Sequence, residues 1–406
     1  MATVRTIKSR RLVAYVIALA AVLGRPLFGA AQDRALLPDT ARWTVEISTR
    51  PSSPPVLGGA HVIVALQAGI VAAHRLSDGV QAWHVELRTE QPLAMDGNRV
   101  FVGSGEAIHA LNAADGLVAW RAQSGTLTAP LLAYQGWIIA ASEGYLAAYR
   151  AADGTQVWKQ PSGPQRARAT IEGNHLYVPL DNGRLQSLDL ATGTLRWERR
   201  FRGTPGEVLA FADRVYVGSA DKSLSCLDAD DGEIEWLFRV GAPTRGRPAG
   251  DATRVYVTGM DNMVRAFDRA DGAMLWHPSV PFRPTMGPFV VGSVVLVAGT
   301  GNEVRAFDAA TGRPAATTRL DLPFATPPAF ADVDGMTVMA ALTGGLTEQW
   351  KLSLWEPGIL TVPIGPLLEL PGTIVPIGTA PPPIPIGPLT ALPGTIVPIG
   401  QAPPKG

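Results

Sequence analysis

The side chains that most often carry out chemistry in proteins are few and scattered in this sequence. Its one cysteine, Cys226, can form neither an intrachain disulfide nor a cluster of thiolate metal ligands. The histidines show no metal-ligand spacing such as His-x-x-x-His; they are His61, His74, His84, His109, His175 and His277. No nucleophile elbow, phosphate-binding loop or pair of catalytic carboxylates stands out. We therefore predict no catalytic, cofactor-binding or metal-binding residues, expect no cofactor, and expect that the protein is not an enzyme.

One acidic segment, Asp228-Ala-Asp-Asp-Gly-Glu233, carries enough oxygen atoms to suggest calcium. An EF-hand loop would need a glutamate several residues later, at the start of a helix. The segment instead falls between two predicted strands, in the place of a tight turn. We interpret these acids as turn formers.

The overall composition describes a large, weakly charged protein. Lys+Arg and Asp+Glu are both 35 in 406 residues, which argues against a nucleic-acid binder that depends on overall positive charge. Hydrophobic residues make up 46% and charged residues 17%, so the chain can bury a sizeable core. The 43 glycines and 35 prolines exclude a mainly helical fold, because both residues interrupt helices.

Residues 1–31 have the pattern of a secretory signal peptide. Basic residues precede the apolar run Leu12–Gly24, and the small residues Gly29-Ala30-Ala31 suit a signal peptidase. The apolar run is shorter than the roughly 20 residues that a membrane-spanning helix needs. No cysteine directly follows this run, so we expect no lipoprotein anchor. We predict export to the periplasm or cell envelope, with only indirect membrane association, and a short lead-in over residues 32–40.

Residues 356–406 form a Pro-rich, low-complexity tail with only Glu369 and Lys405 charged beyond its first residue. A segment of period 22 recurs within it, and its frequent prolines oppose both helix and central strand. We expect a disordered, polyproline-like extension, although its Ile, Leu and Val content leaves a role in adhesion open.

Between these ends, tryptophan marks a repeat. Seven of the ten tryptophans follow one another at intervals of 37 to 40 residues: Trp43, Trp83, Trp120, Trp158, Trp197, Trp236 and Trp276. Asp-Gly or Thr-Gly precedes six of them, and a further copy has Thr311-Gly312 with Ala316 in place of tryptophan. A period of this length is typical of repeat architectures.

Each copy reads as four short strands. In the copy that ends at Trp276, the runs Val255–Val257, Val264–Phe267 and Ala273–Trp276 are separated by turn residues, and a further strand precedes them. Such repeats bury their sheets by closing radially. We predict an all-β fold: an eight-bladed β-propeller over residues 41–355, with the Trp43 segment supplying the outer strand of the last blade.

The segments Ala114-Asp-Gly-Leu-Val-Ala-Trp120 and Ala152-Asp-Gly-Thr-Gln-Val-Trp158 resemble PQQ-like propeller repeats. The resemblance covers roughly residues 41–355 and implies one of two branches: PQQ-dependent quinoprotein dehydrogenases, or the outer-membrane assembly scaffold BamB. The adjacent cysteines typical of the alcohol-oxidising quinoproteins are absent here. In both branches the repeat tryptophan is a packing residue, which is also what its apolar bulk predicts.

We therefore favour a non-catalytic, exported, BamB-like scaffold that binds protein partners of the cell envelope, not nucleic acid, and is monomeric on its own. The alternatives are a PQQ-dependent dehydrogenase and an exported sensor or adhesion module. Connections between blades surround the channel of a propeller, and we predict a partner-binding rim there: Arg166, Arg168, Arg199, Arg200, Arg202, Arg245, Arg247 and Arg283. Five acids on the same face would partly neutralise it: Glu106, Glu143, Asp181, Asp221 and Asp261. The acids of the opposite face, Glu172 among them, are expected to be solvated turn residues.

Overall fold

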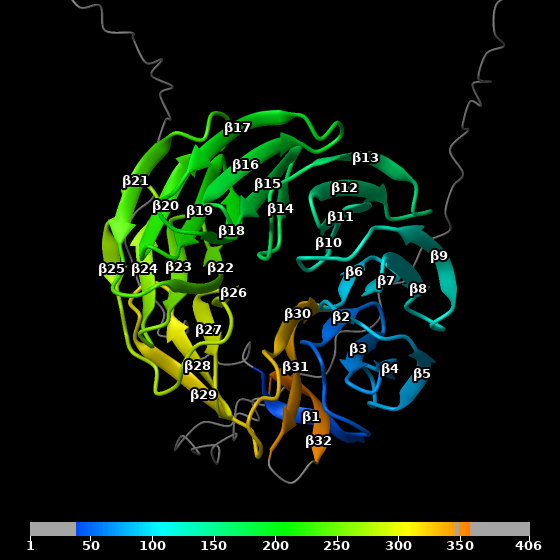
Figure 1. Cartoon of the computed structure of the whole chain (residues 1–406). Coiled ribbons are helices and arrows are strands. Elements are labelled where there is room, and N and C mark those ends of the chain that lie inside the picture. The colour runs from blue at the N-terminus through cyan, green and yellow to red at the C-terminus, as the bar shows by residue number, and fades with distance from the viewer. Residues whose placement is uncertain (1–37, 346–348, 358–406) are drawn as a thin grey trace, which may run out of the picture. The chain divides into compact units, whose positions relative to one another are not determined.

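The computed structural model describes residues 38–345 and 349–357, all within the first of two compact units, residues 1–360. Eight four-stranded antiparallel sheets follow one another around a ring (Figure 1). The predicted eight-bladed propeller is therefore confirmed. The predicted signal peptide and nearly all of the Pro-rich tail lie outside the described residues. No helix occurs among the residues described, and hence none that could span a membrane.

Each blade has four strands, numbered here from the axis outward. The innermost strands are β2 (Val56–Gly58), β6 (Ala94–Asp96), β10 (Leu132–Tyr134), β14 (Thr170–Glu172), β18 (Pro205–Phe211), β22 (Thr244–Gly250), β26 (Phe289–Val291) and β30 (Ala329–Val333). The second strands are β3 (His61–Leu66), β7 (Arg99–Ser104), β11 (Trp137–Ser142), β15 (His175–Leu180), β19 (Arg214–Ser219), β23 (Arg254–Gly259), β27 (Val294–Ala298) and β31 (Met336–Gly344). The third strands are β4 (Ile70–Arg75), β8 (Ala107–Asn112), β12 (Tyr145–Arg150), β16 (Arg184–Asp189), β20 (Ser223–Asp228), β24 (Val264–Asp268), β28 (Glu303–Asp308) and β32 (Trp350–Pro357). The outer strands are β5 (Gln81–Glu86), β9 (Val118–Gln123), β13 (Gln156–Pro161), β17 (Leu195–Arg200), β21 (Ile234–Arg239), β25 (Met274–Trp276), β29 (Pro314–Arg319) and β1 (Pro38–Ile47).

The turn before each outer strand is built from the Asp-Gly pairs. In the β8–β9 turn, the Asp115 carboxylate accepts a hydrogen bond from the Leu117 amide at 2.9 Å, and Gly116 has a φ of +74°. Glycine adopts this left-handed conformation without the steric cost that a Cβ atom brings. The repeat motif therefore encodes the turn directly.

The seven repeat tryptophans join neighbouring blades. Each indole Nε1 donates a hydrogen bond, 2.8–3.1 Å long, to a carbonyl oxygen of the next blade; the acceptors are Leu76, Ala113, Ala151, Leu190, Ala229, Arg269 and Ala309. The rings lie against the glycines of the adjacent turns. Eight hydrophobic clusters, each drawn from two neighbouring blades, fill the junctions. The core of the molecule thus lies between blades, as the packing role of tryptophan predicts.

The last blade joins strands from distant parts of the sequence. β1 pairs antiparallel with β32, with Trp43 opposite Leu354, and Arg42 forms an ion pair of 2.5 Å with Glu356. The Thr318 hydroxyl of β29 donates to the Pro38 carbonyl oxygen at 2.9 Å. The predicted closure of the ring by the Trp43 segment is confirmed.

The closure also explains Ala316, which replaces the repeat tryptophan on β29. The third and outer strands of the last blade, β32 and β1, are far apart in sequence, so no Asp-Gly turn joins them. An indole at position 316 would have no turn glycine to cover. Phe324 and Trp355 pack into the same cluster as Ala316 and fill this junction instead.

Candidate functional site

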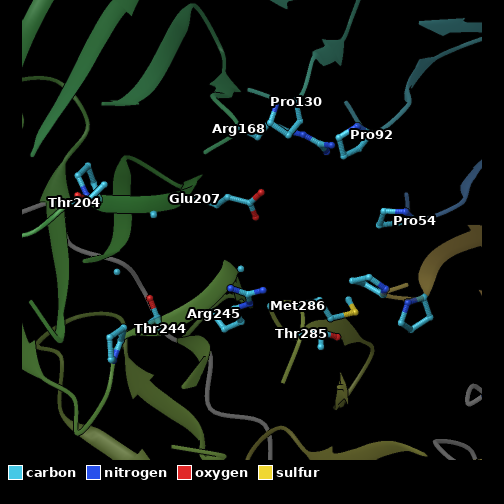
Figure 2. Close-up of a pocket in the computed structure, with 18 of the residues that line it drawn as sticks. Pro54, Pro92, Pro130, Arg168, Thr204, Glu207, Thr244, Arg245, Thr285 and Met286 are labelled. Carbon is cyan, nitrogen blue, oxygen red and sulfur yellow. The ribbon is translucent and has the colours of Figure 1, made fainter. Parts of the chain in front are cut away.

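An axial cavity of about 690 Å³ opens where the connections enter the innermost strands, and residues from all eight blades line it. Prolines at the entry to these strands form much of its wall, and Figure 2 shows Pro54, Pro92 and Pro130 around the opening. An innermost strand is the edge of its sheet, and proline removes an N–H group that would otherwise be exposed there. The mouth of the axial cavity is therefore largely apolar.

Two adjacent innermost strands contain a bulge within the strand itself. In β18, Gly206 and Glu207 stand opposite the single residue Gly218, and in β22 three residues, 246–248, stand opposite Val257. In four other blades a related irregularity precedes the inner strand: an isolated bridge (Pro51↔Leu66, Leu127↔Ser142, Pro284↔Gly299 or Phe324↔Thr343) leaves four residues opposite two before the regular pairing begins. A β-bulge redirects side chains, and bulges are common beside functional sites. These two bulges place Glu207 and Arg247 on the cavity walls.

Gly246 makes the β22 bulge possible. Its φ of +67° is in the left-handed region, and a Cβ atom there would collide with the backbone of Gly287 in the next blade. The sequence Thr-Arg-Gly-Arg-Pro therefore replaces the apolar inner-strand pattern for a structural reason.

A side cavity of about 240 Å³ lies farther along the same strands and gathers four charged side chains: Arg168, Glu172, Glu207 and Arg247. The Arg247 Nε donates to the Val208 carbonyl oxygen at 3.1 Å. Burial lowers the pKa of the Arg247 guanidinium, and the nearby Glu207 and Glu172 carboxylates oppose that shift. The buried Arg168 Nε has no hydrogen-bond partner among the described residues.

Three of the eight predicted rim arginines line the cavities. Arg168 and Arg245 line the axial cavity, and Arg168 and Arg247 line the side cavity. Figure 2 shows Arg168, Glu207 and Arg245 reaching toward the opening from three successive blades. The structure thus brings together part of the predicted set, on the axis of the propeller.

The other five lie elsewhere on the connections and strands. Arg202 and Arg283 are exposed on the connections that enter β18 and β26, and Arg166 is exposed on the connection into β14. Arg199 and Arg200 belong to the outer strand β17, not to a connection, and Arg199 donates to the Gly232 carbonyl oxygen of the neighbouring turn. The expectation that all eight lie on connections is wrong for these two and for Arg245 and Arg247, which belong to β22.

The acids of the same face neutralise the rim less than the sequence suggested. Asp181 pairs with Arg166 at 3.2 Å. Asp221 and Asp261 pair with Arg239 and Arg265, which are not rim residues. No ion pair with another described residue is formed by the remaining predicted arginines of the connections and β22: Arg168, Arg202, Arg245, Arg247 and Arg283.

Sequence reasoning missed the acids of the site. Glu207 was not singled out; Glu172 is exposed at the end of β14, as expected, and also lines the side cavity with Tyr134. The signal that could have revealed Glu207 is the segment Pro205-Gly206-Glu207, which interrupts an otherwise apolar inner strand.

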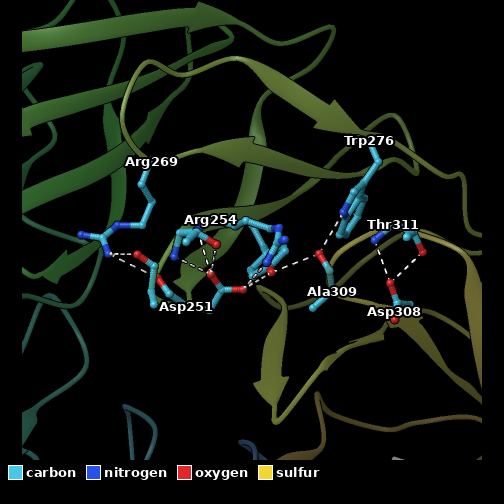
Figure 3. A network of polar contacts seen from close by, with 10 residues as sticks. Asp251, Arg254, Arg269, Trp276, Asp308, Ala309 and Thr311 are labelled. Atoms are coloured by element: carbon cyan, nitrogen blue, oxygen red, sulfur yellow. Dashed lines mark hydrogen bonds and ion pairs between the residues drawn. The ribbon is translucent and has the colours of Figure 1, made fainter. Parts of the chain in front are cut away.

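A second polar cluster, around Asp251, does not form a site; Figure 3 shows it joining the blade of β22–β25 to Ala309 of the next blade, and Arg269 extends it to the blade of β18–β21. The Tyr256 hydroxyl donates to Asp251 and also lies 3.3 Å from the Ala309 carbonyl oxygen, the acceptor of the Trp276 indole. Arg269 donates to the Tyr216 hydroxyl at 3.0 Å and covers the Phe211 ring at 4.5 Å. These groups satisfy one another, so the cluster is a structural contact between blades.

The residues first considered for metal or thiol chemistry have structural surroundings. Asp228 accepts from the Asp230 amide at 2.7 Å, and Asp231 accepts from the Glu233 amide at 2.7 Å, as expected of turn formers. Across the described part of the chain, no three His, Cys, Asp or Glu residues group as metal ligands would. Burial raises the pKa of the Cys226 thiol to about 12, which suppresses thiolate formation.

Comparisons with known proteins place this geometry in a family. The family model described as outer membrane protein assembly factor BamB matches residues 67–208 and 200–347. The BamB proteins of Yersinia pestis and Escherichia coli (strain K12) are 25% identical over 200 residues and 26% identical over 254 residues. These alignments cover 44% and 45% of this chain, and 51% and 64% of those relatives. The chain thus spans between half and two thirds of the curated relatives that it matches.

Among solved structures, BamB from Moraxella catarrhalis superposes with a TM-score of 0.62 at 17% identity, over 78% of this chain and 99% of that one. Quinohemoprotein alcohol dehydrogenase from Comamonas testosteroni gives a TM-score of 0.63 at 14% identity, over 82% and 78%. At such identities the superpositions show a shared fold. The family-model matches extend together over residues 67–347, more than half of the sequence, and the chain therefore belongs to the family of the outer membrane protein assembly factor BamB.

Proposed function

We propose that the protein is a non-catalytic, exported scaffold of the cell envelope that binds protein partners during outer-membrane protein assembly. The observation that carries this proposal is the match of the BamB family model over residues 67–347. Under the proposal, residues 1–31 direct export, residues 41–355 form the binding module, and the protein is monomeric without its partner.

The face that carries the connections is the proposed contact surface. Arg202, Arg245 and Arg283 are exposed there on three successive blades and make no ion pair with described residues. Arginine is enriched at protein interfaces because its planar guanidinium binds carboxylates in a bidentate manner and stacks on aromatic rings. A partner segment with acidic and aromatic residues fits this surface.

The Asp-Gly turn face supplies a matched control. Arg75 and Arg150 there pair with Asp78 and Asp153 within their own turns, at 2.7 and 3.3 Å, and Arg313 is exposed on the β28–β29 turn. Such surface pairs contribute roughly 0–1 kcal/mol to stability, so their removal leaves the fold intact. Replacement of three arginines on either face should therefore change the stability of the fold by a similar, small amount.

The test is complementation in the native bacterium. Deletion of the gene should lower the amount of folded β-barrel protein in the outer membrane, and the wild-type gene should restore it. The triple variant Arg202→Ala/Arg245→Ala/Arg283→Ala should restore it only in part, whereas Arg75→Ala/Arg150→Ala/Arg313→Ala should restore it fully. An unchanged outer membrane after deletion contradicts the assembly role; equal rescue by both variants contradicts the contact surface.

A further inference from the structure

Charged side chains enter the cavities beside two neighbouring innermost strands. β18 and β22 adjoin in the ring, and each carries a bulge within the strand. Glu207 and Arg247 stand on these bulges, and Arg168 reaches the same cavities from the preceding blade. A β-bulge redirects the side chains of its strand, and here Glu207 and Arg247 line the side cavity together.

The four charged side chains of the side cavity form no ion pairs with described residues. Arg168, Arg247, Glu172 and Glu207 nevertheless all line this one cavity of about 240 Å³. The Arg168 Nε is buried without a partner, and the Arg247 Nε donates to a single backbone carbonyl oxygen. A buried donor without an acceptor is unfavourable, and a ligand that supplies the acceptor removes this penalty.

The net charge of the side cavity indicates which kind of ligand it could bind. Two guanidinium and two carboxylate groups give the side cavity no net charge, so a phosphate or a polycarboxylate would meet as much repulsion as attraction. A carboxylate with an N–H group beside it offers an acceptor to the arginines and a hydrogen-bond donor to a glutamate. Arginine takes a carboxylate in a bidentate manner, and a glutamate accepts from the adjacent N–H.

A cavity with several apolar side chains in its wall adjoins this charged point. A third cavity, of about 270 Å³, has Val56, Leu93 and Leu131 in its wall and shares Arg168 with the other two. Proline rings and Met286 line the approach. A carboxylate held at Arg168 would therefore leave room for an apolar side chain beside it.

We propose that the side cavity binds an apolar α-amino-acid carboxylate with an adjacent N–H group, as at the C-terminus of a peptide, through Arg168 and Arg247, with Glu207 accepting from the N–H. The same chemistry occurs in a free amino acid, and the test separates the two sources. The peptide source rests on the proposed function, since it names the part of a protein partner that the propeller would hold.

Calorimetric titration of the purified protein tests the site with four probes: N-acetylphenylalanine, its amide, phenylalanine and inorganic phosphate. We expect N-acetylphenylalanine to bind at least about tenfold more tightly than its amide or phosphate, because only the acid offers the arginines a carboxylate beside an N–H. Tighter binding of N-acetylphenylalanine than of phenylalanine assigns the site to a peptide end, and the reverse order assigns it to a free amino acid.

Variants locate the binding. Arg168→Gln and Arg247→Gln should each weaken N-acetylphenylalanine at least about tenfold, whereas Arg166→Gln, an exposed neighbour paired with Asp181, should leave it unchanged. The Arg247→Lys variant keeps the charge without the planar fork, and its thermal midpoint and circular dichroism show whether the strand has remained in place. Binding of acid and amide with equal affinity, binding unaffected by both arginine variants, or failure of both amino-acid probes to bind would overturn the site. These results do not depend on complementation in the bacterium, so the failure of one proposal is distinguishable from the failure of the other.

Discussion

A glycine and a tryptophan from neighbouring blades form the repeated contact that holds the ring together. Gly154, in the β12–β13 turn, has a φ of +73°, and a Cβ atom built on it would lie 2.5 Å from the Trp120 ring. Glycine is therefore needed there for two separate reasons, its backbone conformation and the closeness of the indole.

Two glycine substitutions can separate the effect of the backbone conformation from the effect of the indole contact. Gly154→Ala should lower the free energy of unfolding by about 2–4 kcal/mol, because strain of the backbone adds to overpacking against the indole. Gly97→Ala, at a φ of +56° with no atom within 4 Å of the new Cβ, should lower it by only about 1 kcal/mol. Urea unfolding followed by tryptophan fluorescence gives both values. Equal losses would mean that the indole contact contributes nothing beyond backbone strain.

At the scale of the element, the outer strand of the last blade closes the ring. β1 covers the edge of β32, and Trp43 covers Gly79 of the first blade as the other repeat tryptophans cover their glycines. An uncovered strand edge pairs readily with other chains. β1 therefore both completes the eighth junction and protects β32.

Removal of residues 38–47 should lower the urea midpoint and promote aggregation, because β32 and the Gly79 turn become exposed. A synthetic peptide of residues 38–47 added in trans should restore the midpoint by strand addition. The same peptide with Trp43→Ala should restore it less, since burial of a tryptophan contributes about 3–5 kcal/mol at such positions. An unchanged midpoint after the deletion would show that the ring does not depend on this strand.

The repeated elements could be predicted from the sequence because each repeat carries its own signal. The tryptophan spacing gave the number of blades, and the unpaired Trp43 segment gave the closure, since each indole needs a partner turn. The site could be predicted only in part. Whether Arg199 lies on a connection or on β17, and whether Glu207 lines a cavity, depends on strand ends and register, which the repeat leaves open by a few residues. Glu207 and Arg247 lie on bulges inside β18 and β22, and neither residue belongs to the periodic pattern of the repeat.

At the scale of the whole molecule, a formal net charge of zero conceals an uneven distribution. On the connection face, several arginines lack ion pairs with described residues, and charged groups converge on the axial cavity. On the opposite face, Asp side chains accept hydrogen bonds from the amides of their own turns. Turn aspartates engaged in this way stabilise local structure, whereas unpaired arginines remain available to a partner.

We propose that this BamB-family propeller binds an assembly partner through its connection face, and site-specific photocrosslinking in living cells tests that contact. A photoreactive residue at position 202, 245 or 283 should crosslink to a protein of outer-membrane assembly, identified by mass spectrometry. The same residue at position 75, 150 or 313, on the Asp-Gly turn face, should give no such product. Crosslinks from the turn face alone, or in equal yield from both faces, would contradict the account.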